Sequence, residues 1–150
     1  MDSFAHAAVG ISLGVLSREH WVTILFGTFS HAIMDSVPHY DFVGASFRKR
    51  FGQKIMLIAE ILSIIAIMGI AIYLRPAYAF WVIWGGFWAC MLDIDKVISY
   101  YFPYFIPKIP SPYREQGLHF WFHSQDTSKG MAFGQVVIAI VALLSIVWWV

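Results

Sequence analysis

Residues 55–74 read IMLIAEILSIIAIMGIAIYL, an apolar run in which Glu60 is the only charged side chain. A run of about 20 apolar residues is long enough to cross a bilayer as a single helix. Further apolar runs lie before and after it, at residues 4–16, 21–37, 76–92 and 131–150. The run at 4–16 is the shortest, so the pattern indicates about five spans with a short first helix.

The composition agrees with this pattern, because 59% of the 150 residues are hydrophobic and only 13% are charged. An ordinary soluble domain carries roughly 25% charged residues. We therefore predict an all-α fold, a polytopic membrane helical bundle that forms one membrane-embedded domain over residues 1–150. The formal net charge of +1 gives no electrostatic reason to expect nucleic-acid binding. The single cysteine, Cys90, rules out an intramolecular disulfide.

Lysine and arginine are shared unevenly between the connections at the two ends of these runs. One end holds Arg48, Lys49, Arg50, Lys54, Lys96, Lys108, Arg114 and Lys129, and the other holds Arg18 and Arg75. Cytoplasmic loops of membrane proteins are enriched in these two residue types. The bias predicts an integral protein of the inner or plasma membrane, with a cytoplasmic N-terminus and an external C-terminus.

Ionisable side chains within the apolar runs indicate a functional site, because such groups are costly in an apolar environment. They are His6, His31, Asp35, Glu60 and Asp93. If successive helices alternate in direction, all of them fall at the same end of the bundle, on the cytoplasmic side. We therefore predict that they form one shared site there.

The densest group of candidate metal ligands is the segment 30–41, SHAIMDSVPHYD. His31 and Asp35 are four residues apart, so a helix brings an imidazole and a carboxylate to one face, where both reach one ion. His119 and His123 repeat this spacing further along the chain. The full set of ligands that we expect is His6, His31, Asp35, His39, Asp93, Asp95 and His123.

The chemistry of this set favours a transition metal. Imidazoles mixed with carboxylates suit zinc above all, with manganese or iron as alternatives, whereas magnesium and calcium prefer oxygen ligands alone. The candidate ligands outnumber what one tetrahedral ion requires, so the set can hold two or more ions. Paired ions of this kind stabilise the attacking and leaving oxygens when a phosphate ester is hydrolysed.

The same residues resemble the motifs of the membrane-bound metal-dependent hydrolase family, whose members are small inner-membrane proteins. The resemblance lies in His6, in Asp93-Ile94-Asp95, in His123-Ser124 and in His31 with Asp35. Residues 31–39, HAIMDSVPH, are also similar to the H-x-x-x-D and P-H elements of the zinc-dependent phospholipase C and single-strand nuclease superfamily. The second resemblance implies a cluster of zinc ions that cleaves phosphodiesters.

We therefore predict a membrane-embedded, metal-dependent hydrolase, a phosphoesterase that acts on a lipid phosphate or phospholipid at the cytoplasmic leaflet. Glu60 or His119 would handle protons. Lys96 and Arg114 would hold the anionic head group, and membrane lipids would be the partners. Two alternatives stay open, a metal or proton transporter and a small structural membrane subunit with a structural metal. A transporter needs polar residues through the full depth of the bundle, and the outer halves of these runs have almost none.

Overall fold

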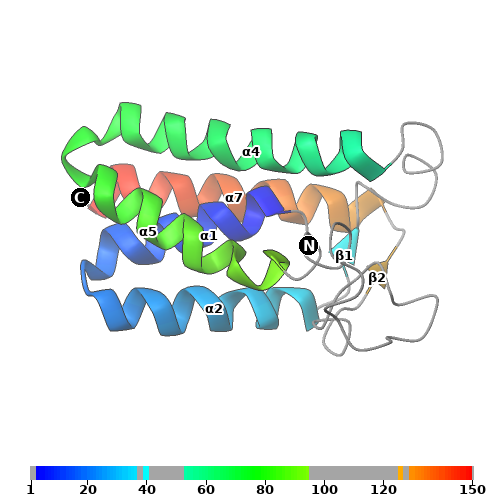
Figure 1. Ribbon diagram of the computed structural model, residues 1–150, viewed down its shortest axis with the longest axis horizontal. Coiled ribbons are helices and arrows are strands. Elements are labelled where there is room, and N and C mark those ends of the chain that lie inside the picture. The colour runs from blue at the N-terminus through cyan, green and yellow to red at the C-terminus, as the bar shows by residue number, and fades with distance from the viewer. Residues whose placement is uncertain (1–2, 37–38, 41–52, 95–124, 127–128, 150) are drawn as a thin grey trace.

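The computed structural model describes residues 3–36, 39–40, 53–94, 125–126 and 129–149, which form a helical bundle (Figure 1). Its α-helices are α1 (Ser3–Ser17), α2 (His20–Ser36), α4 (Gln53–Leu74), α5 (Ala79–Cys90) and α7 (Lys129–Trp149). Short 3₁₀ helices flank α5, η1 (Pro76–Tyr78) before it and η2 (Met91–Asp93) after it. Two short strands, β1 (His39–Tyr40) and β2 (Gln125–Asp126), pair in parallel with His39 opposite Gln125.

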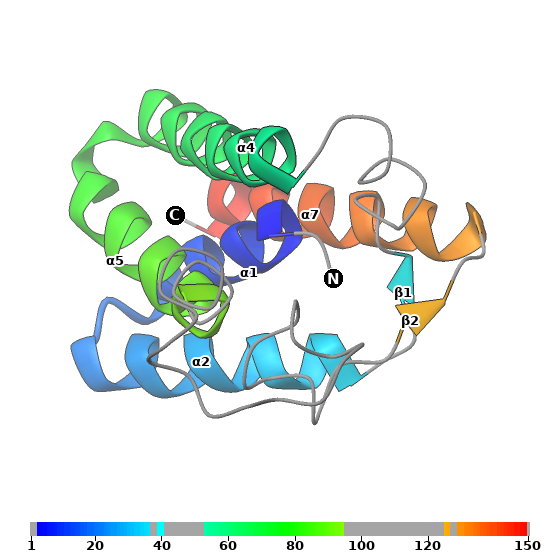
Figure 2. The same ribbon diagram turned by 45° about the vertical axis from the view of Figure 1, so that its right-hand side comes forward.

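The helix α1 lies at the centre of the bundle and contacts α2, α4, α5 and α7 (Figures 1 and 2). Its sequence explains this place, because small residues occupy much of its surface: Ala5, Ala7, Ala8, Gly10 and Gly14, all of them buried. Small side chains let neighbouring backbones approach closely on several sides. A helix buried on nearly all sides therefore needs no polar face.

The closest approach in the bundle is between α1 and α5, where glycine faces glycine. A Cβ atom added to Gly85 would collide with the carbonyl oxygen of Gly10, and one added to Gly14 would collide with the carbonyl oxygen of Trp81. Beside this crossing the hydrophobic core contains Ile11, Val15, Ala71, Val82 and Ile146. The glycines thus fix the separation at which α1 and α5 pack.

Two tight connections lie at the same end of the bundle. After α1, Arg18 adopts a left-handed backbone with a φ of 51°, and its N–H donates to the carbonyl of Gly14 at 3.0 Å, which ends the helix. After α4, Pro76 opens η1 and leads directly into α5. Both connections reverse the chain, so α1 runs antiparallel to α2, and α4 to α5 (Figure 1).

The predicted membrane spans are wrong for the part of the chain that the structure describes. The helices α1, α2 and α5 have 15, 17 and 12 residues, fewer than the roughly 20 that a bilayer requires. Within the described ranges, no helix is both long and apolar enough to cross a membrane.

This finding corrects the prediction of a polytopic membrane bundle with transmembrane helices. It also removes the basis for placing the protein in the inner or plasma membrane, with its N-terminus and site on the cytoplasmic side and its C-terminus outside. The transporter alternative is not tested by this finding and stays a prediction. An apolar run indicates that a helix is buried, but it does not show whether lipid or other helices bury it. In this protein, four neighbouring helices bury α1.

Candidate metal centre

Four chain segments bring ionisable side chains together at the end of the bundle opposite the two tight connections. His6 lies near the start of α1 and Glu60 near the start of α4, whereas His31 and Asp35 lie near the end of α2. Asp93 closes η2, just after α5. Because these helices alternate in direction, starts and ends meet at one place. The five ionisable side chains that the sequence places at one end of the bundle do lie together there, and their joint role as a functional site stays a prediction.

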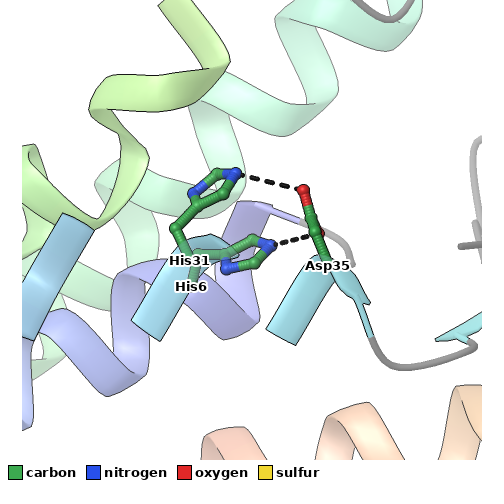
Figure 3. A group of neighbouring side chains, drawn as sticks. All are labelled: His6, His31 and Asp35. Atoms are coloured by element: carbon green, nitrogen blue, oxygen red, sulfur yellow. Dashed lines mark hydrogen bonds and ion pairs between the residues drawn. The ribbon is translucent and has the colours of Figure 1, made fainter. Parts of the chain in front are cut away.

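The centre of this site is a buried group of two imidazoles and one carboxylate, shown in Figure 3. His6 Nε2 donates to Asp35 Oδ1 at 3.0 Å, and His31 Nε2 lies 3.2 Å from Asp35 Oδ2. The two imidazole rings are stacked, with their centroids 3.8 Å apart. One ligand atom from each of the three residues lies within 4.8 Å of the others. His6, His31 and Asp35 are a group that can hold a metal ion.

The orientation of His31 is set by the backbone of α5. Its Nδ1–H donates to the carbonyl oxygen of Ala89. That bond turns Nε2 toward two carboxylates, Asp35 at 3.2 Å and Asp93 Oδ1 at 3.6 Å. A hydrogen bond from the second ring nitrogen is the usual way in which proteins fix a metal-binding histidine. The sequence has no signal for this contact, because a backbone carbonyl carries no residue signature.

Ser3 extends the site outward from Asp93. Its hydroxyl lies 3.2 Å from Asp93 Oδ2 and 3.4 Å from Glu60 Oε2, so it joins these two carboxylates. Sequence reasoning missed Ser3, although it stands three residues before His6 on the same helix and therefore faces the same side. Glu60 and Asp93 are only partly buried, in contrast to His6, His31 and Asp35.

Burial and pairing shift the three central groups in different directions. Burial lowers the pKa of His6 from 6.5 to about 4, against the effect of its hydrogen bond to Asp35. Burial also disfavours charged His31, but the hydrogen bond to Asp35 and the charge of Asp93 outweigh it and raise the pKa of His31 above 6.5. For Asp35 burial is likewise outweighed, and the hydrogen bonds from His31 and His6 hold the pKa of this carboxyl well below its usual range.

These shifts predict that acid destabilises the metal-free protein between about pH 6.5 and pH 4. In that range the unfolded chain binds a proton on His6 that the folded protein excludes, because folding lowers the pKa of His6 from 6.5 to about 4. The contribution of His31 is fully present below pH 6.5, and that of Asp35 is lost only at lower pH, so neither changes across this window. We expect a loss of about 3 kcal/mol in the free energy of unfolding.

Denaturant unfolding of the metal-free protein at several pH values measures this loss. His6→Gln should flatten the dependence on pH, since the titrating imidazole is gone. His20→Gln is the matched control, because His20 is an exposed histidine at the other end of the bundle. An unchanged slope in His6→Gln would contradict the assignment to His6.

The donor set fits a divalent transition metal. Asp35 and Asp93 both place a carboxylate oxygen near His31 Nε2, so a cation bound beside this nitrogen would lie close to two negative charges. Arg18 and Arg75, the arginines whose side chains the structure describes, lie at the opposite end and cannot neutralise that charge. His6 Nδ1 has no hydrogen-bond partner among the described residues. Imidazole and carboxylate together are the ligands that zinc, manganese and iron bind.

The structure describes the position of only one of the remaining predicted site residues. His39 lies in β1, where its backbone pairs with Gln125 of β2. The other candidates lie outside the described residues, namely the ligands Asp95 and His123, the proton carrier His119, and the head-group residues Lys96 and Arg114. Their roles stay predictions, and so does the second metal ion that depended on them.

Comparisons with models of protein families, with curated proteins and with solved structures found no match to this chain. The resemblance to membrane-bound metal-dependent hydrolases therefore stays a prediction based on short motifs. Any function assigned to the chain depends on the geometry of its site.

Proposed function

We propose that this protein is a metal-dependent hydrolase that cleaves phosphate esters, with His6, His31 and Asp35 as metal ligands. The observation that supports this proposal is the buried convergence of two imidazoles and a carboxylate, with Asp93 directed at the same imidazole nitrogen. Zinc is the ion that we propose first, with manganese or iron as alternatives. When bound, such an ion supplies a Lewis acid for a phosphoryl oxygen and lowers the pKa of water.

The chain's own residues divide the remaining roles between them. Asp93 completes the ligand set, because its Oδ1 lies 3.6 Å from His31 Nε2. Glu60 is the proton acceptor, since it is partly exposed and is joined to Asp93 through the hydroxyl of Ser3. The partly buried side formed by Asp93 and Glu60 is where substrate approaches, because the three central residues are closed to solvent.

The substrate that we propose is a lipid phosphate or phospholipid. Large apolar side chains are exposed on all four outer helices, among them Phe29 on α2, Ile65 on α4, Ile83 on α5 and Val141 on α7. Such surfaces bind the hydrocarbon part of an amphiphile, while the metal centre binds its phosphate. Membrane lipids are accordingly the partners that we propose.

A structural metal centre is the second candidate. One observation favours it: His6, His31 and Asp35 are at most 1% exposed, and structural sites are closed to solvent. A structural ion stabilises the fold without turnover, so its removal unfolds the protein. A catalytic ion leaves some ligand-side variants folded and inactive. The two candidates therefore differ in what a variant next to the metal does.

Glu60→Gln is the experiment that tests the proposed function. We expect this variant to keep the metal content of the parent and to lose about 10²–10⁴-fold in turnover, since a general base contributes about that much. The measurements are elemental analysis and hydrolysis of p-nitrophenyl phosphate, bis-p-nitrophenyl phosphate and phosphatidic acid. Glu19→Gln is the matched control, because Glu19 is an exposed glutamate at the other end of the bundle, and it should change neither quantity.

Two results would contradict the proposal in different ways. A parent protein that binds metal, hydrolyses none of the three esters and unfolds on chelation would establish the structural centre instead. Full turnover in Glu60→Gln would leave the hydrolase in place and remove Glu60 from its mechanism.

A further inference from the structure

The outer helices α2, α4, α5 and α7 each expose large apolar side chains. We define the apolar collar by six of them that are more than half exposed: Phe26, Phe29, Leu62, Ile65, Ile83 and Val141. These helices surround α1 (Figures 1 and 2), and each of them carries exposed collar residues. Proteins in water expose such side chains singly, so an apolar surface of this extent marks an interaction site.

Aromatic and basic side chains gather at one end of the collar. Trp21, Tyr73 and Trp148, at 76%, 86% and 83%, are the most exposed large apolar side chains of the described residues. Arg18 and Arg75 lie at the same end, where the Arg18 guanidinium sits 6.0 Å from the Tyr78 ring centre and Arg75 donates to the carbonyl of Val147. Tryptophan and tyrosine favour lipid head groups, and arginine is attracted to anionic ones.

We infer that the collar binds phospholipid, with acyl chains against the apolar side chains and anionic head groups beside Arg18 and Arg75. The exposed aromatic side chains beside two arginines at one end favour lipid over a protein partner or a second copy, because this combination is typical of contacts with lipid head groups. The charge at that end suits anionic head groups, because its described residues include two arginines and one glutamate, Glu19. Contact with the surface of a bilayer needs no helix that crosses it. The inference rests on the lipid partner of the proposed function, but it does not depend on the metal centre.

Vesicle flotation tests this inference. The purified full-length protein, exchanged out of detergent, is mixed with vesicles of phosphatidylcholine alone or with phosphatidylserine added, and is then centrifuged through a density gradient. We expect the protein to float with both kinds of vesicle and to bind the anionic ones more tightly. Exchanging Arg18 and Arg75 for glutamine should weaken binding to the anionic vesicles by about fivefold for each arginine removed.

Exchanging both arginines for lysine is the matched control, because lysine keeps the charge and should keep the binding. Far-UV circular dichroism monitors folding in each variant, so this control does not require a bound metal. A protein that stays in the dense fractions with both kinds of vesicle would overturn the inference. A stable dimer that does not float would overturn it as well and would assign the collar to a second copy. Equal binding to neutral and anionic vesicles would overturn the head-group part.

Discussion

Replacing Asp35 with asparagine should abolish metal binding and destabilise the metal-free protein by about 3–5 kcal/mol. Asp35 is the carboxylate that both imidazoles contact, at 3.0 Å from His6 and 3.2 Å from His31. Without it the site keeps Asp93 as its only proposed anionic ligand among the described residues, and the carboxylate that contacts both imidazoles is lost. The charged form of His31 also loses the hydrogen bond that outweighs its burial. A buried charge left without its partner is strongly destabilising.

Elemental analysis and denaturant unfolding measure the two effects of Asp35→Asn. We expect metal affinity to fall by at least ~100-fold, because even outer groups around a metal are worth about 10–100-fold. The double variant His31→Gln, Asp35→Asn separates the effects. It removes both members of the buried pair, so it should recover much of the lost stability and still bind no metal. Normal metal content in Asp35→Asn would show that the ion, if one binds, lies elsewhere.

Gly85→Ala adds one methyl group between α1 and α5, and we expect it to lower the free energy of unfolding strongly. The added Cβ meets the backbone carbonyl of Gly10, which cannot rotate away as a side chain can. Overpacking of this kind costs about 3 kcal/mol, and the better helix propensity of alanine returns about 1 kcal/mol. The net loss is therefore about 2 kcal/mol or more. Because α1 carries His6 and α5 positions His31 through Ala89, metal affinity should fall as well.

Gly69→Ala provides the matched control for this prediction. Gly69 lies inside α4, where an added Cβ has no neighbour within 4 Å. Alanine there should stabilise the protein by about 0.5–1 kcal/mol through helix propensity alone. Thermal unfolding and metal titration of both variants measure the effects. If Gly85→Ala is as stable as Gly69→Ala, the close packing of α1 on α5 is wrong.

The positions of the helices along the chain follow from the sequence. Whether lipid or other helices surround each of them does not. Each of the apolar runs contains one α-helix, because apolar length and the breaks at Arg18 and Pro76 are local properties of the chain. The membrane prediction is wrong because it took apolar length as evidence of lipid around every run. The run at 4–16 is instead buried by other helices, as its alanines and glycines permit.

The candidate site divides in the same way. The spacing of His31 and Asp35 predicts that they share a helical face, and the structure brings them to 3.2 Å. The contact of His6 with Asp35 joins residues 29 positions apart, and no local pattern encodes its distance. Ser3 and the carbonyl of Ala89 were not predicted at all, since neither residue type is a usual ligand. His39 lies in β1, which follows α2 in the chain, and the structure gives only its backbone pairing with Gln125.

By itself, the sequence determined the helical segments and the chemistry available at one end of them, because hydropathy and the i, i+4 spacing act within a single helix. Only the tertiary structure decided which of those groups meet. His6 meets Asp35 where α1 packs on α2, and His31 meets the carbonyl of Ala89 where α2 packs on α5. Gly10 and Gly85 in turn set how closely α1 approaches α5. How two helices pack depends on the side chains of both, so the sequence of one helix does not show which other helix it will contact.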